Sequence, residues 1–193
     1  MIVDWDLHHG NGTQHSFYND PRVLYFSTHQ YPYYPGTGSL QEIGRGPGEG
    51  YTINVPLREG AGDASFVTIF RKILDPLALE YQPELILLSA GFDTYFQDPL
   101  GGMRVTPEGF AAMVRVLLNI ADACCQGRLV AILEGGYHVA GLTRSVKAVL
   151  EEMLDETHVS EEKISSLEEE ADEETGQLIN KVFSGIRPYW KKF

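Results

Sequence analysis

Hydrophobic residues in this chain form two alternating patterns, short continuous runs and longer runs with helical spacing. Four or five of the short runs have the length and the β-rich composition of strands, at residues 2–6, 23–28, 51–57, 85–90 and 129–133. The last two runs are almost entirely apolar, which is typical of strands that are covered on both faces of a parallel sheet. We therefore expect these two strands at the centre of the sheet.

Helical spacing occupies the segments between the strands. It extends over about residues 63–81, over residues 107–125 behind Thr106 as an N-cap, and from about residue 141 past residue 150. This alternation predicts the α/β class with a mainly parallel sheet. Residues 29–50 contain three prolines and six glycines and predict a long irregular loop. Loops of that length in compact domains are usually functional or disordered, and the tyrosines of this one argue against disorder.

The formal net charge of −12 is concentrated in one segment. Residues 1–150 carry −5, residues 151–174 carry −11, and residues 175–193 carry +4. The acidic block indicates a solvated helix face or a flexible segment. Because no basic stripe could neutralise phosphates, direct binding of nucleic acid is not expected. No run approaches the ~20 apolar residues of a membrane span, and no signal-peptide layout opens the chain. We expect a soluble, cytoplasmic protein without a membrane partner.

The first strand carries polar side chains on one face. Strand alternation places Asp4, Asp6 and His8 together, with Trp5 and Leu7 on the opposite face. On a buried strand such groups are costly unless they are hydrogen-bonded or bind a cation. Asp and His are ordinary zinc ligands, and such a set with one open position is typical of a catalytic zinc. The spacing alone leaves open both a metal site and a hydrogen-bonded core cluster.

Two later strands are also followed by residues that could bind a ligand or take part in catalysis. Asp93 follows one strand, and Gly135, Gly136 and Tyr137 follow another. Ligands of open parallel sheets bind beyond the carboxyl ends of the strands, so these residues should lie over the same edge as the polar face of the first strand. The alternatives are a helix N-cap for Asp93 and a partly buried aromatic ring for Tyr137. The two glycines fit a tight turn that brings backbone close to a ligand.

Four motifs, in this order and spacing, resemble those of the histone deacetylase and acetoin-utilisation family: DWDLHHGNGTQ at 4–14, YPGTG at 34–38, SAGFD at 89–93 and EGGY at 134–137. The resemblance is closer to class II and bacterial members than to class I. It implies an arginase/deacetylase-like three-layer α/β domain with a mainly parallel sheet. Residues 1–150 would be the C-terminal portion of that catalytic domain, and residues 151–193 an acidic helical extension with a short basic and aromatic end.

The resemblance also assigns roles to individual residues. It implies that Asp6, His8 and Asp93 bind Zn²⁺ and that Tyr137 donates a hydrogen bond to the oxyanion of the tetrahedral intermediate. A monovalent cation such as K⁺ would lie nearby, bound partly through main-chain carbonyls by Asp4, Asp6, His8, Ser27 and Thr28. The substrate, an acetylated lysine peptide or a small acetyl-amine, would contact Tyr33, Tyr34, Leu100, Gly135 and Gly136.

The chain departs from the family pattern at its start. Family members carry tandem histidines upstream of the first motif, as general base and acid, together with the opening strands of the sheet, and this chain has neither. His9 would make a structural hydrogen bond rather than replace that base. We therefore expect an N-terminally truncated domain with weak or absent turnover, because general acid–base catalysis is worth ~10²–10⁴ in rate. We also expect the first strand to form an unpaired apolar edge that promotes self-association.

Three hypotheses follow. The first is a zinc-dependent amide hydrolase that removes acetyl groups, impaired by the missing histidines. The second is a catalytically inactive zinc- and acyl-binding module, or a gene fragment. The third is an unrelated protein in which Asp4, Asp6 and His8 form a core network, and it predicts that no metal binds.

Overall fold

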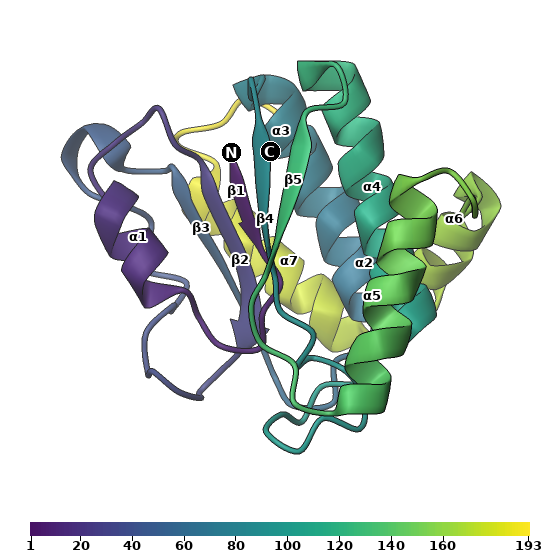
Figure 1. The fold of residues 1–193 in the computed structure, drawn as a ribbon. Helices are drawn as coiled ribbons and strands as arrows, with labels where there is room; N and C mark the ends of the chain where they lie inside the picture. The colour runs from purple at the N-terminus through teal and green to yellow at the C-terminus, as the bar shows by residue number, and fades with distance from the viewer.

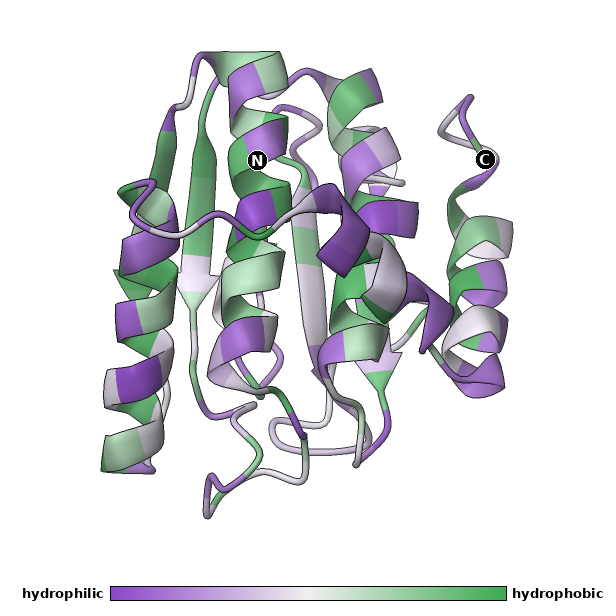
Figure 2. Ribbon diagram, turned by 90° about the vertical axis from the view of Figure 1, so that its right-hand side faces the viewer, coloured by the Kyte–Doolittle hydropathy of each residue, from purple (hydrophilic) through white to green (hydrophobic).

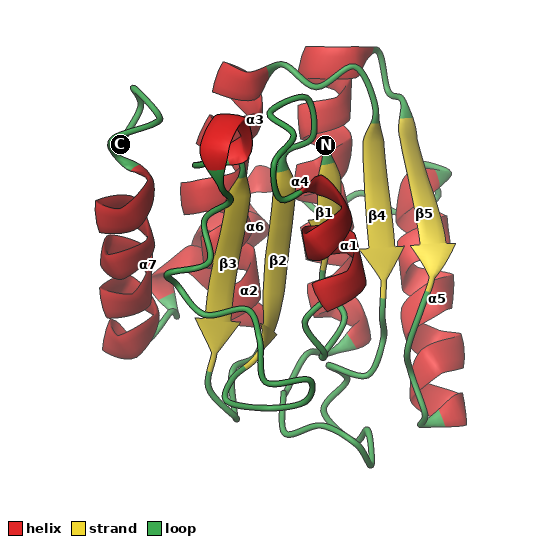
Figure 3. Ribbon diagram, turned by 90° about the vertical axis from the view of Figure 1, so that its left-hand side faces the viewer, coloured by secondary structure: helices red, strands yellow, loops and turns green.

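The computed structural model describes residues 1–193 and contains one five-stranded sheet. Its strands are β1 (Ile2–Asp4), β2 (Tyr25–Gln30), β3 (Thr52–Leu57), β4 (Ile86–Ala90) and β5 (Leu129–Leu133). They are arranged in the order β3-β2-β1-β4-β5, and every neighbouring pair is parallel. All five strands therefore end at the same edge of the sheet (Figure 3), which confirms the α/β class with a parallel sheet.

Seven α-helices connect and follow the strands: α1 (Asn11–Phe17), α2 (Asp63–Ile69), α3 (Asp75–Tyr81), α4 (Pro107–Cys125), α5 (Val139–Met153), α6 (Glu161–Glu169) and α7 (Glu173–Ile186). The helix predicted over residues 107–125 is confirmed, and the Oγ1 of Thr106 accepts a hydrogen bond from Gly109 N at 3.2 Å. The helix predicted over residues 63–81 is interrupted by a π-helical turn at Phe70–Leu74. Pro76 lies two residues after this turn, in the first turn of α3, and since proline has no N–H it cannot donate to the regular α-helical ladder.

Most helices cover one face of the sheet (Figure 1). Trp5 is fully buried there, with its ring centroid 6.4 Å from that of Phe70 and 5.8 Å from that of Phe110. The last two helices join the same core through apolar residues of α6 and α7, among them Ile164, Leu167, Ile179, Val182 and Ile186. Along both helices hydrophilic and hydrophobic residues alternate (Figure 2).

The acidic block has one apolar side and one charged side. Arg71 pairs with Glu161 and Glu168 of α6, and Arg58 pairs with Asp172 and Glu174 near the start of α7. These pairs lie at or near the surface, where each is worth little in stability. The buried apolar side of the two helices therefore holds this segment on the rest of the chain.

The other face of the sheet is covered by α1 and the segment between β2 and β3, while β4 and β5 are unobstructed (Figure 3). The prediction that the first strand is an exposed edge is wrong, because β1 lies between β2 and β4. Order along the chain does not determine order in the sheet, and β4 pairs with the side of β1 that β2 leaves free. Self-association through that strand therefore has no structural basis.

The exposed edge is β5. The apolar run at residues 129–133 was expected at the centre of the sheet, and this prediction is also wrong, because β5 pairs only with β4. The prediction for residues 85–90 is confirmed, since β4 has a partner on each side. None of the helices is long and apolar enough to cross a membrane.

Candidate metal centre

Asp6, His8 and Asp93 converge beyond the carboxyl ends of β1 and β4. Their ligand atoms all lie within 4.8 Å of one another. The Nδ1 of His8 is 3.2 Å from Oδ1 of Asp6 and 3.1 Å from Oδ2 of Asp93. The three residues that the sequence predicted as zinc ligands thus form one cluster.

The backbone after β1 positions these side chains. Trp5 and Leu7 are fully buried and anchor the segment on the helical side. Leu7 N donates to Oδ1 of Asp93 at 2.8 Å, and His8 N donates to Oδ1 of Asp6 at 2.8 Å. One oxygen of each carboxylate is therefore held by a main-chain N–H group, and the orientation of both carboxylates is set before any ligand binds.

The donor set fits a divalent cation. The Oδ2 atom of Asp93 is buried and forms no hydrogen bond of its own, because its nearest donor, Nδ1 of His8 at 3.1 Å, is bonded to Asp6; this is costly for a carboxylate in a protein interior. Two carboxylates and one imidazole supply the oxygen and nitrogen ligands of ordinary zinc sites, and with three protein ligands one position stays open. A cation here would satisfy the unpaired oxygen and neutralise the two acids.

Gly135 closes one side of the cluster. Its N–H donates to Oδ2 of Asp6 at 3.0 Å. A Cβ atom at this position would lie 2.4 Å from Oδ2 of Asp93 and 2.7 Å from Oδ2 of Asp6, so any side chain would displace both carboxylates. Gly136 follows with a φ of +132°, a conformation that other residues rarely adopt. The predicted close approach of this turn to a ligand site is consistent with this geometry.

The electrostatics of the cluster favour a positive charge. The carboxylates of Asp6 and then of Asp93, both within 3.2 Å of Nδ1, raise the pKa of His8 to about 10. Burial raises the pKa of Asp93, although its contact with His8 acts in the opposite direction. Burial, reinforced by the nearby charge of Asp6, raises the pKa of Asp4 to about 8. The same concentration of negative charge that holds a proton on His8 would attract a metal ion.

Tyr137 lies at the rim of this cluster with 53% of its surface exposed. It lines a cavity of about 460 Å³ together with Asp6, His8 and Gly135. Tyr137 N donates to Oδ2 of the buried Asp98 at 2.7 Å, and the other oxygen of Asp98 accepts a hydrogen bond from Leu100 N at 3.0 Å. Asp98 thus joins two rim segments. The sequence drew attention only to its neighbour Leu100, although an acid before Pro99 is a turn signal.

Tyr33, Tyr34 and Leu100 lie near the metal ligands, where the resemblance placed the substrate tunnel. The ring centroids of Tyr33 and Tyr34 are 5.8 Å and 6.1 Å from that of His8. The hydroxyl of Tyr33 donates to the main-chain carbonyl of Leu100 at 2.7 Å. The rings of Tyr33 and Tyr34 thus lie beside His8, and all three side chains are partly or largely exposed.

His9 belongs to a separate buried network. Its Nδ1 lies 2.8 Å from Oγ1 of Thr37 and its Nε2 lies 2.9 Å from Oε1 of Gln14. Gln14 also donates to Glu42 at 2.6 Å and accepts from Asn54 at 2.7 Å. The structural role predicted for His9 fits this arrangement. The other members were missed, because no local pattern marks a glutamine, a glutamate and an asparagine that meet only in the fold.

Three of the residues predicted to hold a monovalent cation, Asp4, Ser27 and Thr28, lie on β1 and β2 and are buried, whereas Asp6 and His8 follow β1 and are half-buried. Asp4 pairs with Ser27 in the strand register. The hydroxyl of Thr28 donates to the main-chain oxygen of Asp4 at 3.3 Å, and Ser27 Oγ lies 2.9 Å from Nδ1 of His29. Both hydroxyls thus have protein partners, and the K⁺ site remains a prediction that rests on the resemblance.

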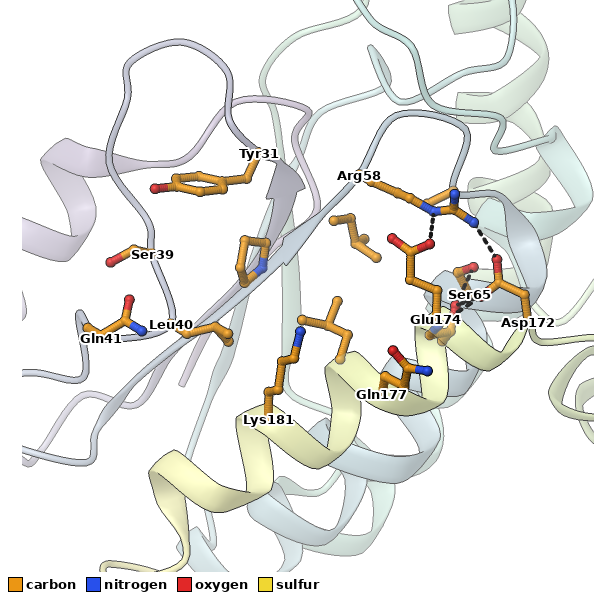
Figure 4. A pocket seen from close by; sticks show the side chains of 15 residues that line it. Tyr31, Ser39, Leu40, Gln41, Arg58, Ser65, Asp172, Glu174, Gln177 and Lys181 are labelled. Atoms are coloured by element: carbon orange, nitrogen blue, oxygen red, sulfur yellow. Dashed lines mark hydrogen bonds and ion pairs between the residues drawn. The ribbon is translucent and has the colours of Figure 1, made fainter.

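A second cavity, of about 330 Å³, lies between β3, α7 and the segment at residues 39–41 (Figure 4). Its most prominent charged group, Arg58, is paired with Asp172 at 2.9 Å and with Glu174 at 2.8 Å. No cluster of metal-ligating groups lies in this cavity. The chemistry of the chain is therefore concentrated at the carboxyl ends of β1 and β4.

Comparison with known proteins agrees with this geometry. The histone deacetylase domain family matches residues 1–153. The chain is 51% identical over 140 residues to a probable deacetylase of Archaeoglobus fulgidus, a match that covers 72% of this chain and 39% of that protein. It is 48% identical over 162 residues to the histone deacetylase HDA1 of Candida albicans, covering 81% of this chain and 19% of that protein. The chain thus spans less than half the length of these relatives.

Solved structures show the same relationship. The crystal structure of the HDA15 HD domain superposes with a TM-score of 0.87 at 36% identity, covering 99% of this chain and 51% of that one. The histone deacetylase Clr3 superposes with a TM-score of 0.86 at 37% identity, covering 98% of this chain and 32% of that one. The expected arginase/deacetylase-like fold is confirmed. The ligand cluster, the fold and these matches together place the chain in the histone deacetylase family.

Proposed function

We propose that this chain forms the metal-binding and oxyanion-stabilising portion of a zinc-dependent deacetylase, an amide hydrolase acting on acetylated lysine or a small acetyl-amine. The observation that carries the proposal is the convergence of Asp6, His8 and Asp93 around an unpaired, buried carboxylate oxygen. Tyr137 stands beside this cluster at the rim of the cavity. The family membership of the chain supports the same reaction class.

Each residue of the site would have a separate role in the reaction. A bound zinc would polarise the acetyl carbonyl and lower the pKa of a bound water. Asp6, His8 and Asp93 would hold the ion, while Asp98 holds the Tyr137 segment through its main-chain N–H. The hydroxyl of Tyr137 would donate to the negative oxygen that develops on the carbonyl, a contribution typically worth ~10²–10³ in rate.

The remaining step is proton transfer, which neither His8 nor His9 is placed to perform. His8 faces the two carboxylates, and both ring nitrogens of His9 are engaged by Thr37 and Gln14. We therefore infer weak turnover for this chain by itself, as the absence of the tandem histidines suggested. The K⁺ site and the cytoplasmic location are further parts of this proposal that rest on the sequence alone.

A test combines metal content with turnover. Zinc would be quantified in the purified chain by mass spectrometry, and hydrolysis of an acetyl-lysine peptide followed in wild type, Asp93→Ala and Tyr137→Phe. We expect one zinc per wild-type chain and per Tyr137→Phe chain, and none in Asp93→Ala. Any turnover should fall ~10²–10³-fold in Tyr137→Phe. A wild-type chain that binds no zinc at excess metal, or turnover unchanged in Asp93→Ala, would contradict the proposal.

The occupied nitrogens of His9 also favour a second candidate, a zinc- and acyl-binding module without catalysis. The same experiment separates the two candidates. Stoichiometric zinc together with measurable binding of the acetyl-lysine peptide, but no hydrolysis above the Asp93→Ala background, would identify the module. Hydrolysis that depends on both Asp93 and Tyr137 would exclude it.

A further inference from the structure

Three hydrogen bonds of the segment between β2 and β3 meet at the carboxylate of Glu42. Its Oε1 accepts from the main-chain N–H groups of Gly38 at 3.0 Å and Ser39 at 2.9 Å, and its Oε2 accepts from Nε2 of Gln14 at 2.6 Å. Burial acts to raise the pKa of Glu42, but the hydrogen bonds from Ser39 and Gln14 outweigh it and lower that pKa. Glu42 is therefore an anion at neutral pH, and an ionised carboxylate can only accept hydrogen bonds.

This charge fixes the direction of the hydrogen bonds beyond Glu42. The amide of Gln14 must turn its nitrogen toward the carboxylate, which leaves its Oε1 as an acceptor. Nδ2 of Asn54 donates to that oxygen at 2.7 Å, and Nε2 of His9 lies 2.9 Å from it. His9 therefore carries its proton on Nε2, and its Nδ1 accepts from the hydroxyl of Thr37 at 2.8 Å. One carboxylate thus determines both an amide orientation and a histidine tautomer.

The same hydrogen bonds anchor the chain at residues 37–39, directly after a turn at residues 33–36. The turn is closed by Gly36 N, which donates to the carbonyl of Tyr33 at 2.8 Å. After it, the carbonyl of Gly38 accepts from Nε2 of His29 at 2.8 Å. The backbone packs so closely against this ring that a Cβ atom at Gly38 would lie 2.4 Å from Nε2. The end of the turn is therefore fixed on both its N–H and its carbonyl groups.

The turn carries the two aromatic rings beside the metal ligand His8. Tyr33 is 38% exposed, and its hydroxyl is held by the carbonyl of Leu100. Tyr34 is 76% exposed, and its only aromatic neighbour is His8, so little packing holds its ring. The position of such a ring depends on its backbone, and this backbone depends on the anchor at residues 37–39. Side chains that contact a ligand are commonly fixed by hydrogen bonds of this kind behind them.

We propose that Glu42 is a positioning residue of the substrate site, which fixes the turn that carries Tyr33 and Tyr34 and thereby sets the affinity for an acetyl-lysine side chain. The inference deepens the proposed function, on which it rests for the identity of the substrate. The position of the turn itself requires neither zinc nor turnover. None of the hydrogen bonds of Glu42 reaches a metal ligand, so zinc affinity should not depend on it.

The network permits an exchange of the two central side chains. In Glu42→Gln one amide nitrogen must face another donor, and in Gln14→Glu two carboxylates face each other. The double variant reverses the polarity and satisfies every group. The amide at position 42 then donates to the carboxylate at position 14, which still accepts from His9 and Asn54. The matched control is Gln41→Glu, which adds the same charge at an exposed neighbouring position.

Calorimetric titration would measure binding of an acetyl-lysine peptide to the zinc-loaded chain, and competition with a chromophoric chelator would measure zinc affinity. Each single variant should bind the peptide at least ~10-fold more weakly, or about 1.4 kcal/mol, at unchanged zinc affinity. The double variant should recover most of the wild-type affinity, and Gln41→Glu should match the wild type. Thermal unfolding would verify that each variant folds. Thr37→Val, which removes one hydroxyl from the same network, replaces Glu42→Gln if that variant is unfolded.

A second measurement needs neither zinc nor substrate. Fluorine NMR of the metal-free chain labelled with 3-fluorotyrosine would report the surroundings of Tyr33 and Tyr34, with their signals assigned from Tyr33→Phe and Tyr34→Phe. Glu42→Gln should shift or broaden these two signals more than those of the other tyrosines, and the double variant should restore them.

Unchanged signals of Tyr33 and Tyr34 in Glu42→Gln would overturn the inference. A double variant that binds the peptide no better than the single variants, or a loss of zinc affinity equal to the loss of peptide affinity, would also overturn it and leave Glu42 a general structural role. A chain that binds no zinc would contradict the proposed function alone, and the fluorine signals would then decide between positioning and no positioning.

Discussion

Two neighbouring histidines, His8 and His9, end in opposite environments. The side chain of His8 is 25% exposed and faces two carboxylates, one of which keeps an unpaired oxygen. His9 is 3% exposed, and each of its ring nitrogens has a partner. The adjacent carboxylates of Asp6 and Asp93 raise the pKa of His8 to about 10, whereas burial lowers that of His9. A ligand site therefore differs from a structural network in having polar atoms that no protein group satisfies, and not in the type of residue it contains.

Substitution of His8 should give the largest effect on metal binding. Loss of an outer-shell partner typically costs 10–100-fold in metal affinity, so loss of a direct ligand in His8→Ala should cost at least ~10²-fold. Zinc affinity would be measured by competition with a chromophoric chelator. His9→Ala is the matched control and should bind zinc almost normally. Equal losses in the two variants would show that the two histidines do not differ in the way the structure indicates.

His9→Ala should instead destabilise the fold. It removes a buried ring and leaves Thr37 and Gln14 without their partner, which should lower the free energy of unfolding by about 2–3 kcal/mol. Urea denaturation of the metal-free chain measures this value. A decrease in the free energy of unfolding below about 0.5 kcal/mol would mean that the hydrogen bonds of His9 contribute little to holding the loop at residues 29–50 in place.

The same buried region should make stability depend on pH. Burial lowers the pKa of His29 from an ordinary value of 6.5 to about 3, so the folded chain keeps this ring neutral while the unfolded chain protonates it. Its contribution is fully present above pH 6.5 and is lost as the pH falls toward 3, by about 1.4 kcal/mol per pH unit. Between pH 6.5 and 5.5, the wild type should therefore lose about 1 kcal/mol more stability than His29→Gln, because the full slope is reached only below about pH 5.5. Equal slopes in His29→Gln and the wild type would show that His29 does not carry this pH dependence.

The smallest effect is expected at Gly135. An added methyl would collide with the Oδ2 atoms of Asp6 and Asp93 and push the two carboxylates apart. Gly135→Ala should therefore weaken zinc binding about 3–10-fold, with little change in fold stability. Gly12→Ala, where the methyl would meet no other atom within 4 Å, is the matched control. Unchanged zinc affinity in Gly135→Ala would indicate that the carboxylates have more freedom than the structure shows.

Much of the fold and of the site was predictable because both depend on local patterns. Apolar runs located the strands to within about two residues, and Thr106 with Pro107 located the start of α4. Strand alternation placed Asp6 and His8 on one face, and the ends of two strands identified Asp93 and Tyr137. Patterns of two to five residues record such features directly, since they reflect the geometry of a single strand or helix.

Contacts between distant segments were not predictable in the same way. Asp98 holds the Tyr137 segment across 39 residues, and Asn54 meets Gln14 across 40. Each of these residues is an ordinary polar position in its own segment. These residues form hydrogen bonds with one another only because the fold brings them together and excludes water, which would otherwise be their partner.

The sequence by itself determined the class of fold, the family and the candidate metal-ligating residues, because these are recorded in spacing along the chain. Only the tertiary structure decided that β1 is interior and that β5 is the exposed edge. The reason is that the apolar composition of a strand indicates only that the strand can be buried. Its place in the sheet depends on which other strands are present to pair with it.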